Sequence, residues 1–201
     1  MGKTYKVNEI FYSLQGEGYH AGTPAVFIRF SGCNLQCPWC DTKHQDGKRI
    51  TAKEIISQVL QSLNGARPIL VVLTGGEPTL QVDEALVNCL RVIFPVVAIE
   101  TNGTHPVPQN VNFITVSPKT DFINGPEIVT KKADEIKLVF TGNNNPEKWL
   151  AIINAPRHYL QPCDTGNAEE TSRVVNACVE YCKANPEWKL SLQTQKILNI
   201  R

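Results

Sequence analysis

Three cysteines stand close together early in the chain, at Cys33, Cys37 and Cys40. In a regular strand the side chains alternate between two faces, so Cys33 and Cys37 would lie on one face and Cys40 on the other. Gly32 and Pro38 favour an irregular loop instead, and a loop can turn all three sulfurs toward one point. Three convergent thiolates are soft ligands that suit zinc or an iron–sulfur cluster. The spacing therefore predicts a metal site in a loop.

The number of thiols leaves two kinds of metal site open. A closed structural zinc site needs four protein ligands, whereas a cubane cluster held by three cysteines keeps one iron free to bind another molecule. His44 follows Cys40 at a spacing that completes a possible four-ligand zinc site. On spacing alone, a cluster and zinc fit equally well.

Length and charge limit the classes of protein that this chain can belong to. Its 201 residues suffice for one domain with a substantial core, so we expect a single domain over residues 1–201. The 20 basic and 19 acidic residues leave a net charge of +1, which gives no electrostatic basis for binding nucleic acid through its phosphates. The longest apolar runs are far too short to cross a membrane. Because the N-terminus has no signal or myristoylation pattern, we expect a cytoplasmic protein with reduced thiols.

The elements that must position the cysteine loop alternate between strands and helices. We expect strands at residues 7–14, 25–31, 69–73, 96–99, 111–116, 135–140, 158–160 and 190–192, and helices at 51–63, 83–94, 127–133, 146–153 and 169–184. Such alternation implies a mostly parallel sheet with right-handed connections. The chain is shorter than the ~250 residues of a closed eight-stranded barrel. The sequence therefore predicts an α/β fold, a partial (open) β/α barrel of about six to seven mostly parallel strands.

Polar residues follow every predicted strand. In a parallel sheet these ends share one rim, where ligands bind, and the cysteine loop follows the first strand of that rim. Arg29 lies near the end of an apolar strand, so it needs either a structural carboxylate or a substrate as its partner. The glycines on both sides of Glu17 allow close approach to a ligand, although a plain turn explains them more simply.

The other four cysteines give no second metal site. Cys178 and Cys182 belong to an apolar stripe on a predicted helix, where free cysteine packs as a small hydrophobic residue. Cys89 is expected to pack in the same way, and Cys163 follows a predicted strand without an assigned role.

Two motifs resemble those of the radical S-adenosylmethionine enzymes. The cysteine loop, with Trp39 before its last cysteine, resembles their cluster loop, and the run from Gly75 to Pro78 is similar to the main-chain element that holds the methionine amino group of S-adenosylmethionine. Within that superfamily, a pattern over essentially the whole chain resembles the 7-carboxy-7-deazaguanine synthases of queuosine and deazapurine biosynthesis. The stretches that carry it are residues 14–18, Arg29, and residues 40–42, 74–78, 100–104, 117–119 and 193–196.

The resemblance implies a lyase that uses a [4Fe-4S] cluster, S-adenosylmethionine and Mg²⁺. The substrate would be 6-carboxy-5,6,7,8-tetrahydropterin, from which a 5′-deoxyadenosyl radical takes a hydrogen at C6. Ring contraction and loss of ammonia would then give 7-carboxy-7-deazaguanine. The protein would hold the substrate against the cofactor and exclude water and oxygen.

The resemblance also implies roles for particular residues. The metal ligands would be Cys33, Cys37 and Cys40 for iron and Thr42 for Mg²⁺, an ion that prefers oxygen donors. The substrate would be bound by Leu14, Gln15, Gly16, Arg29 and Thr74. S-adenosylmethionine would be surrounded by Trp39, Cys40, Asp41, Gly76, Ser117, Pro118 and Lys119. Glu17 is a candidate acceptor for the pterin N–H groups, and Asn102 and Gln161 are rim residues without an assigned contact.

One position departs from the family pattern. The tails of these enzymes often contain Gln-Thr-His-Lys, whereas Gln195 stands at the histidine position here. Because the tail reaches the substrate pocket, Gln195 and Arg201 leave the far wall of that pocket undefined. Glutamine still donates and accepts hydrogen bonds, so we expect the same reaction with altered contacts.

Two other functions remain open from the sequence. A glycyl-radical activating enzyme would share the cysteine loop but act on a partner protein, and residues 15–18 and 40–42 argue against it. A zinc-stabilised binding module would use His44 as its fourth ligand and leave the polar rim unexplained. The partners that we expect are a pterin substrate, a flavodoxin-like electron donor and a second copy in a homodimer, with no nucleic acid and no membrane.

Overall fold

The computed structural model describes residues 2–42, 44–119 and 125–201. Within these residues one nine-stranded sheet has the strand order β3-β1-β2-β4-β5-β6-β7-β8-β9. The strands are β1 (Thr4–Leu14), β2 (Pro24–Phe30), β3 (Lys48–Thr51), β4 (Leu70–Gly75), β5 (Val96–Thr101), β6 (Phe113–Val116), β7 (Glu135–Phe140), β8 (His158–Pro162) and β9 (Lys189–Leu190). All pairs from β2 to β9 along this order are parallel, whereas β1 pairs antiparallel with both β2 and β3. The predicted open, mostly parallel sheet is confirmed.

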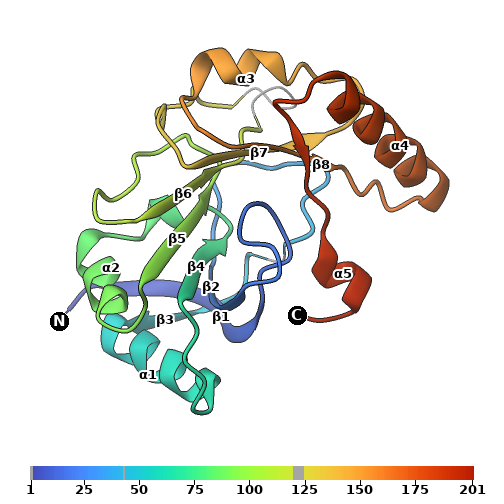
Figure 1. Cartoon of the computed structure of the whole chain (residues 1–201). Coiled ribbons are helices and arrows are strands. Elements are labelled where there is room, and N and C mark those ends of the chain that lie inside the picture. Colours follow the sequence, from blue (N-terminus) through green and yellow to red (C-terminus); the bar gives the residue numbers. More distant parts are fainter. Residues whose placement is uncertain (1, 43, 120–124) are drawn as a thin grey trace.

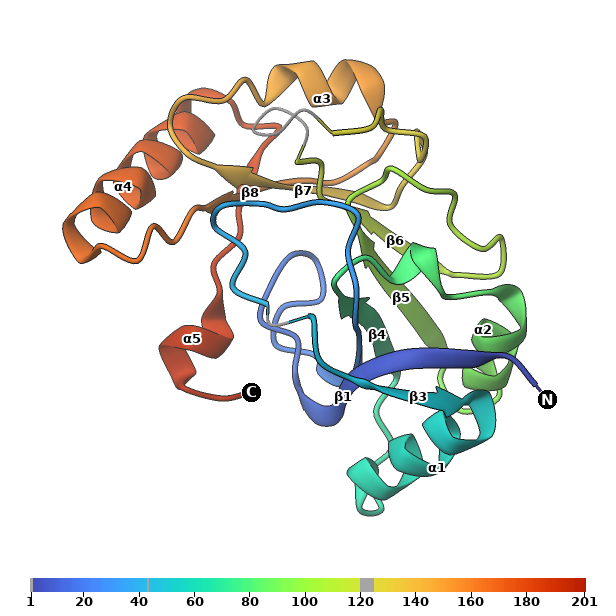
Figure 2. The same ribbon diagram turned by 180° about the vertical axis from the view of Figure 1, so that it is seen from behind.

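The sheet curves into an open barrel with helices on its outer side (Figures 1 and 2). The helices are α1 (Ala52–Leu63), the short 3-10 helix η1 (Pro78–Leu80), α2 (Glu84–Arg91), α3 (Glu147–Ile152), α4 (Ala168–Ala184) and α5 (Thr194–Leu198). The predicted capping box starts α1, because Thr51 N donates to Glu54 Oε2 at 2.7 Å and Thr51 Oγ1 accepts from Glu54 N at 3.3 Å. Asn64, in the left-handed conformation, ends this helix.

Three features differ from the prediction. Strand β3 was not expected, because it is a short polar strand that forms only by pairing with β1. Helix α5 lies in the C-terminal tail, for which no helix was expected. The helix expected at residues 127–133 is absent from the structure; instead Val129 N bonds to Gly103 O at 2.9 Å and Ala133 N to Asn154 O at 3.0 Å. These long-range bonds override a weak local helix propensity.

Two apolar clusters hold the helices against the outer face of the sheet. One joins α1 and α2 to β1, β2, β4 and β5, and the other joins α3 and α4 to β6, β7 and β8. Cys178 is fully buried in the second cluster and Cys182 packs against it, so their predicted core role is confirmed. The same prediction was wrong for Cys89, which is exposed because the buried face of α2 consists of Leu86, Val87 and Leu90. No helix in the described part of the chain is long and apolar enough to cross a membrane.

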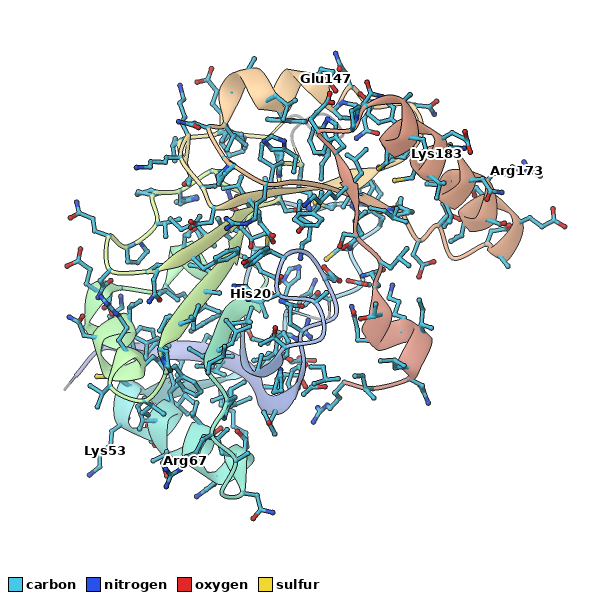
Figure 3. All side chains as sticks on the ribbon, viewed as in Figure 1. His20, Lys53, Arg67, Glu147, Arg173 and Lys183 are labelled. Atoms are coloured by element: carbon cyan, nitrogen blue, oxygen red, sulfur yellow. The ribbon has the colours of Figure 1, made fainter. Side chains whose placement is uncertain are left out.

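The inner face of the sheet changes from apolar to polar toward the strand ends. A third apolar cluster covers this face before the strand ends. It includes Phe11 stacked on Phe27, with their ring centroids 5.0 Å apart. Since side chains alternate along a strand, Arg29 follows Phe27 on the same face, and Glu100 follows Ala98. By contrast, charged side chains such as Lys53, Arg173 and Lys183 point outward from the helices (Figure 3).

Candidate functional site

A cavity of about 480 Å³ opens on the concave side of the sheet, at the carboxyl ends of the parallel strands. The loop after β1 enters this side of the barrel (Figure 1). The cavity has the size of a typical site for small molecules. Its position at the strand ends is the one predicted from the polar rim.

Nearly all of the predicted site residues line this one cavity. They are Leu14, Gln15, Gly16, Arg29, Cys33, Cys37, Trp39, Cys40, Asp41, Thr42, Thr74, Gly76, Ser117 and Lys119. Pro118 is the predicted site residue that does not line it. The less specific candidates Glu17, Asn102, Gln161, Gln195 and Arg201 also line the cavity. Residues separated by most of the chain length are thus brought to one place.

The cysteine loop carries its three thiols to the cavity wall. Leu35 N donates to Cys33 Sγ at 3.4 Å, and Cys40 N bonds to Cys37 O at 3.1 Å. Burial raises the pKa of the Cys33 and Cys37 thiols, and the other loop sulfurs raise it further, while Lys119 acts in the opposite direction on Cys37. Cys33, Cys37 and Cys40 all line the cavity. Their protons must leave when a metal binds.

The donor set fits an iron–sulfur cluster held by three thiols. Cys163 lines the same cavity from the end of β8, but the charged groups that shift its pKa most are Asp164 and Glu170. Cys163 lies outside the loop, at the end of β8, and among the described residues no contact between it and the three loop thiols supports a role as a fourth ligand. His44 lines the cavity too, yet within the described residues no three His, Cys, Asp or Glu side chains converge closely enough to hold a metal ion. The loop thus supplies three thiols, but the described side chains do not form a complete metal-binding site.

The turn after β4 lies directly against the start of the cysteine loop. A Cβ atom on Gly76 would lie 2.0 Å from Gly32 O, so only glycine fits there. Glu77 N donates to Gly32 O at 2.8 Å. The turn and the start of the cysteine loop are therefore packed main chain against main chain, and Gly75 and Gly76 line the cavity beside that contact.

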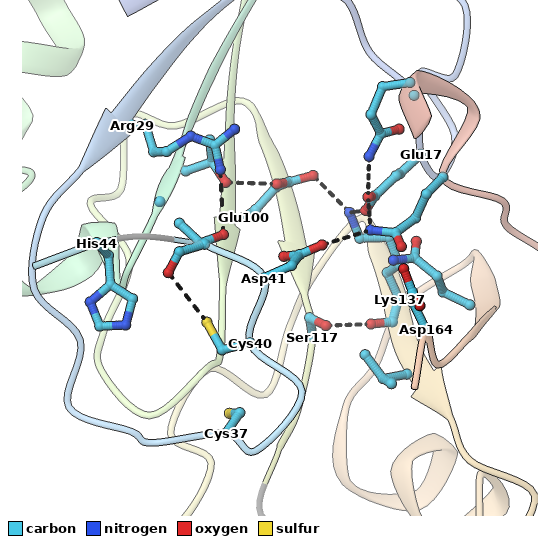
Figure 4. Close-up of a pocket in the computed structure, with 18 of the residues that line it drawn as sticks. Glu17, Arg29, Cys37, Cys40, Asp41, His44, Glu100, Ser117, Lys137 and Asp164 are labelled. Carbon is cyan, nitrogen blue, oxygen red and sulfur yellow. Dashed lines mark hydrogen bonds and ion pairs between the residues drawn. The ribbon is translucent and has the colours of Figure 1, made fainter. Parts of the chain in front are cut away.

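A buried lysine joins two carboxylates at the floor of the cavity (Figure 4). Lys137 Nζ lies 2.6 Å from Glu17 Oε2 and 2.7 Å from Glu100 Oε1, and the lysine side chain is only 7% exposed. Burial opposes the ionisation of Glu17, but Lys137 and hydrogen bonds from two glutamines outweigh it and lower its pKa to about 2. For Lys137 the burial effect is also outweighed, and its two carboxylate partners raise its pKa. Glu17 and Lys137 are therefore both charged at neutral pH.

Arg29 is part of a second polar group in the cavity. Its Nε lies 2.9 Å from Glu9 Oε1, and its Nη1 donates to Thr42 Oγ1 at 3.4 Å. Arg201 Nη2 lies 2.5 Å from Glu9 Oε2, so one carboxylate holds both arginines. Arg29 thus has a structural carboxylate as its partner and still borders the cavity beside the predicted Mg²⁺ ligand Thr42.

The C-terminal tail forms one wall of the cavity. Gln193 Nε2 and Gln195 Nε2 donate to Glu17 Oε1 at 3.1 and 2.9 Å. Lys196 Nζ lies 3.0 Å from Asp41 Oδ2, so Asp41 contacts the tail. Gly16 also packs against the tail, because a Cβ there would overlap Gln195. The tail therefore closes the side of the cavity that faces Glu17.

Sequence reasoning missed several residues of this cavity, above all Lys137. The same signal that singled out Arg29 was present, because Lys137 is a cation inside the apolar run of β7. Glu100 was recognised as part of a motif but not as an inward-facing ion-pair partner. The resemblance placed the tail at the pocket, but its contacts with Glu17 and Gly16 have no local signal, since these partners are about 180 residues away in the sequence.

Known proteins resemble this chain over nearly its full length. Residues 27–165 match the radical SAM superfamily. The 7-carboxy-7-deazaguanine synthase of Bacteroides thetaiotaomicron is 45% identical over 98% of this chain and 98% of that protein. The synthase of Caulobacter vibrioides is 40% identical over 98% of this chain and 99% of that protein. Among solved structures, QueE from Escherichia coli is 29% identical, with a TM-score of 0.75 over 94% of this chain and 93% of that one.

Proposed function

Because the chain belongs to the radical SAM superfamily and, within it, to the 7-carboxy-7-deazaguanine synthases, we propose that its cavity binds 6-carboxy-5,6,7,8-tetrahydropterin and converts it to 7-carboxy-7-deazaguanine with loss of ammonia. The chain is a carbon–nitrogen lyase of queuosine biosynthesis. One observation carries the proposal: a single cavity combines three thiols of one loop with a charged floor built from Glu17, Glu100 and Lys137.

The enzyme uses a [4Fe-4S] cluster and S-adenosylmethionine. Cys33, Cys37 and Cys40 would hold the cluster, and the main chain of the turn at Gly76, which lines the same cavity, would bind S-adenosylmethionine. When bound, this pair supplies a carbon-centred radical that takes a hydrogen atom from the substrate. Trp39, Asp41, Ser117 and Lys119 line the same cavity and are the proposed side-chain contacts of S-adenosylmethionine.

The carboxylate of the pterin would lie beside Arg29 and Thr42. A guanidinium is well suited to a carboxylate because it offers planar N–H donors. Thr42 Oγ1 is 3.4 Å from Arg29 Nη1. One substrate carboxylate could therefore bind both the Arg29 guanidinium and a Mg²⁺ ion held by Thr42. Glu9 fixes the arginine from the other side.

The pterin ring would lie against the charged floor. Glu17 and Glu100 offer carboxylate oxygens that both lie against Lys137, and this lysine lowers the pKa of Glu17 against the effect of its burial. Acceptors of this kind suit the N–H groups of an aminopyrimidinone, and Glu17 already accepts two side-chain N–H groups of the tail. Leu14, Gln15, Gly16 and Thr74 are the proposed wall of this subsite. The tail over this wall would exclude water during the reaction.

The experiment that tests this function is anaerobic reconstitution with iron and sulfide, followed by product analysis. We expect 7-carboxy-7-deazaguanine from the carboxylated tetrahydropterin when S-adenosylmethionine, Mg²⁺ and a reductant are present. A colourless zinc protein without acid-labile sulfide would contradict the proposal. Turnover that required a partner protein instead of the pterin would favour a glycyl-radical activating enzyme.

Membership of the family supports three further proposals. A flavodoxin-like protein would be the electron donor. To test this, reduced flavodoxin replaces the chemical reductant in the same assay. Two copies would form a homodimer, which sedimentation equilibrium tests. The free cysteines suit a reducing compartment, so we infer a cytoplasmic location, which cell fractionation tests.

A further inference from the structure

A closed ring of side-chain hydrogen bonds ties the cysteine loop to the end of β5. Asn102 Nδ2 donates to Asn34 Oδ1 at 3.0 Å, and Asn34 Nδ2 donates to Thr104 Oγ1 at 2.9 Å. Thr104 Oγ1 donates to Asn102 Oδ1 at 2.7 Å and completes the ring. Asn34 directly follows Cys33, so the ring holds the loop beside its first thiol.

The side chain of Glu77 supports the ring through hydrogen bonds to the chain around Asn102. Glu77 is fully buried, and it accepts from Asn102 N at 2.7 Å and Thr101 Oγ1 at 2.8 Å. It also accepts from Thr79 N at 3.0 Å and Thr79 Oγ1 at 2.6 Å. A buried polar group is tolerated only when such hydrogen bonds satisfy it. Glu77 therefore joins the turn after β4 to the residues that start the ring.

A third connection links that turn to the cysteine loop from the other side of Cys33. Glu77 N bonds to Gly32 O, and Gly76 packs against the same carbonyl group. Cys33 is thus flanked by Gly32 and Asn34, and both neighbours bond to one unit that contains Glu77. The thiol and the main chain of the turn are fixed relative to each other.

We propose that Asn102 and Thr104 are positioning residues that hold Asn34, and thereby Cys33, at a fixed distance from the turn between Gly75 and Pro78. This inference rests on the proposed function, in which Cys33 binds iron and that turn binds S-adenosylmethionine. Asn102 would act through Asn34 and not by contact with the reacting atoms. The ring prepares the first ligand before any metal is bound.

The test is a Co²⁺ titration of the reduced, cluster-free chain, followed by the thiolate-to-cobalt absorption. Asn34→Ala and Thr104→Val each remove bonds of the ring, so we expect affinity for Co²⁺ to fall by about three- to tenfold. Thr104→Ser keeps the hydroxyl group and should restore the wild-type affinity. Asn8→Ala is the matched control, because Asn8 Nδ2 donates to Asp46 O at 3.0 Å, beyond the thiols and outside the ring.

Equal affinities in wild type and the Asn34 and Thr104→Val variants would overturn the inference. The inference would also be overturned if Asn8→Ala lost as much affinity for Co²⁺ as the ring variants. It would likewise be overturned if the wild type bound Co²⁺ no more tightly than Cys33→Ser does. Asn102→Ala is a harsher variant of a buried residue, and the other two decide the outcome if it does not fold. In the reconstituted enzyme the same variants should bind S-adenosylmethionine about three- to tenfold more weakly. Failure of the wild type to make 7-carboxy-7-deazaguanine would refute the proposed function. The Co²⁺ titration would still test, independently, whether the ring positions Cys33.

Discussion

The Glu17 carboxylate lies 2.6 Å from the Lys137 ammonium, although the two residues are 120 positions apart in the sequence. The contact joins the loop after β1 to β7, and both side chains are largely buried. It fixes the floor of the cavity from two sides of the barrel. The same lysine also reaches Glu100 at the end of β5, so three elements depend on one cation.

Lys137→Met should destabilise the protein by about 3–5 kcal/mol, because it leaves two largely buried carboxylates without their cation. Urea unfolding at neutral pH measures this change in the free energy of unfolding. Lys183→Met is the control: this lysine pairs with Glu180 on the exposed face of α4 and should cost less than about 0.5 kcal/mol. Equal losses in the two variants would show that the buried ion pair adds nothing.

Glu17→Gln should flatten the dependence of stability on acid pH. Against the unfavourable effect of burial, Lys137 lowers the pKa of Glu17 from 4.5 to about 2 in the folded state. A lowered folded-state pKa adds stability that is full above the unfolded value and is lost as the pH falls toward the folded value. The wild type should therefore lose more stability than the variant between about pH 5 and pH 3. Glu187→Gln, at an exposed position, should follow the wild type, and parallel curves for all three proteins would disprove the argument.

His44→Ala should retain iron and sulfide after anaerobic reconstitution, whereas Cys33→Ser should lose both. The reason is that the three thiols satisfy a cluster with one open iron, without help from an imidazole. Iron and acid-labile sulfide per chain are the measured quantities. Loss of metal from the histidine variant would instead indicate a four-ligand zinc site.

Gln195→Ala should raise the KM for the pterin by about three- to tenfold, because it removes one hydrogen bond to Glu17 at the cavity wall. Gln195→His should change the same constant, since an imidazole has a different reach. Gln61→Ala, on the exposed side of α1, is the control. If the KM for the pterin were unchanged in both Gln195 variants, the proposal that the tail forms part of the substrate pocket would be wrong.

Local patterns predicted most of the fold. The capping box at Thr51 and Glu54, and the alternation of apolar strands with amphipathic helices, depend on near neighbours in the chain. The helix expected at residues 127–133 failed because bonds to Gly103 and Asn154 determine the conformation there. Strand β3 was missed for a similar reason, since its pairing partner β1 lies more than 30 residues away.

The residues of the site were predictable where they form a motif. The cysteine spacing, the glycine turn after β4 and Arg29 all led to side chains that line one cavity. Pro118 was expected there as well, but it does not line it. Lys137 carries no motif, and the tail motif at residues 193–196 does not reveal its partners, because these lie on distant elements.

By itself, the sequence determined the kind of chemistry: three thiols at loop spacing, a glycine-rich turn after a predicted strand, and an alternation of strands and helices that indicates a parallel sheet. Only the tertiary structure decided which charges meet, because a carboxylate such as Glu17 acquires its low pKa from groups brought to it by folding. Ionisation and ligand geometry depend on distances of a few ångströms. Those distances are set by the packing of the whole barrel.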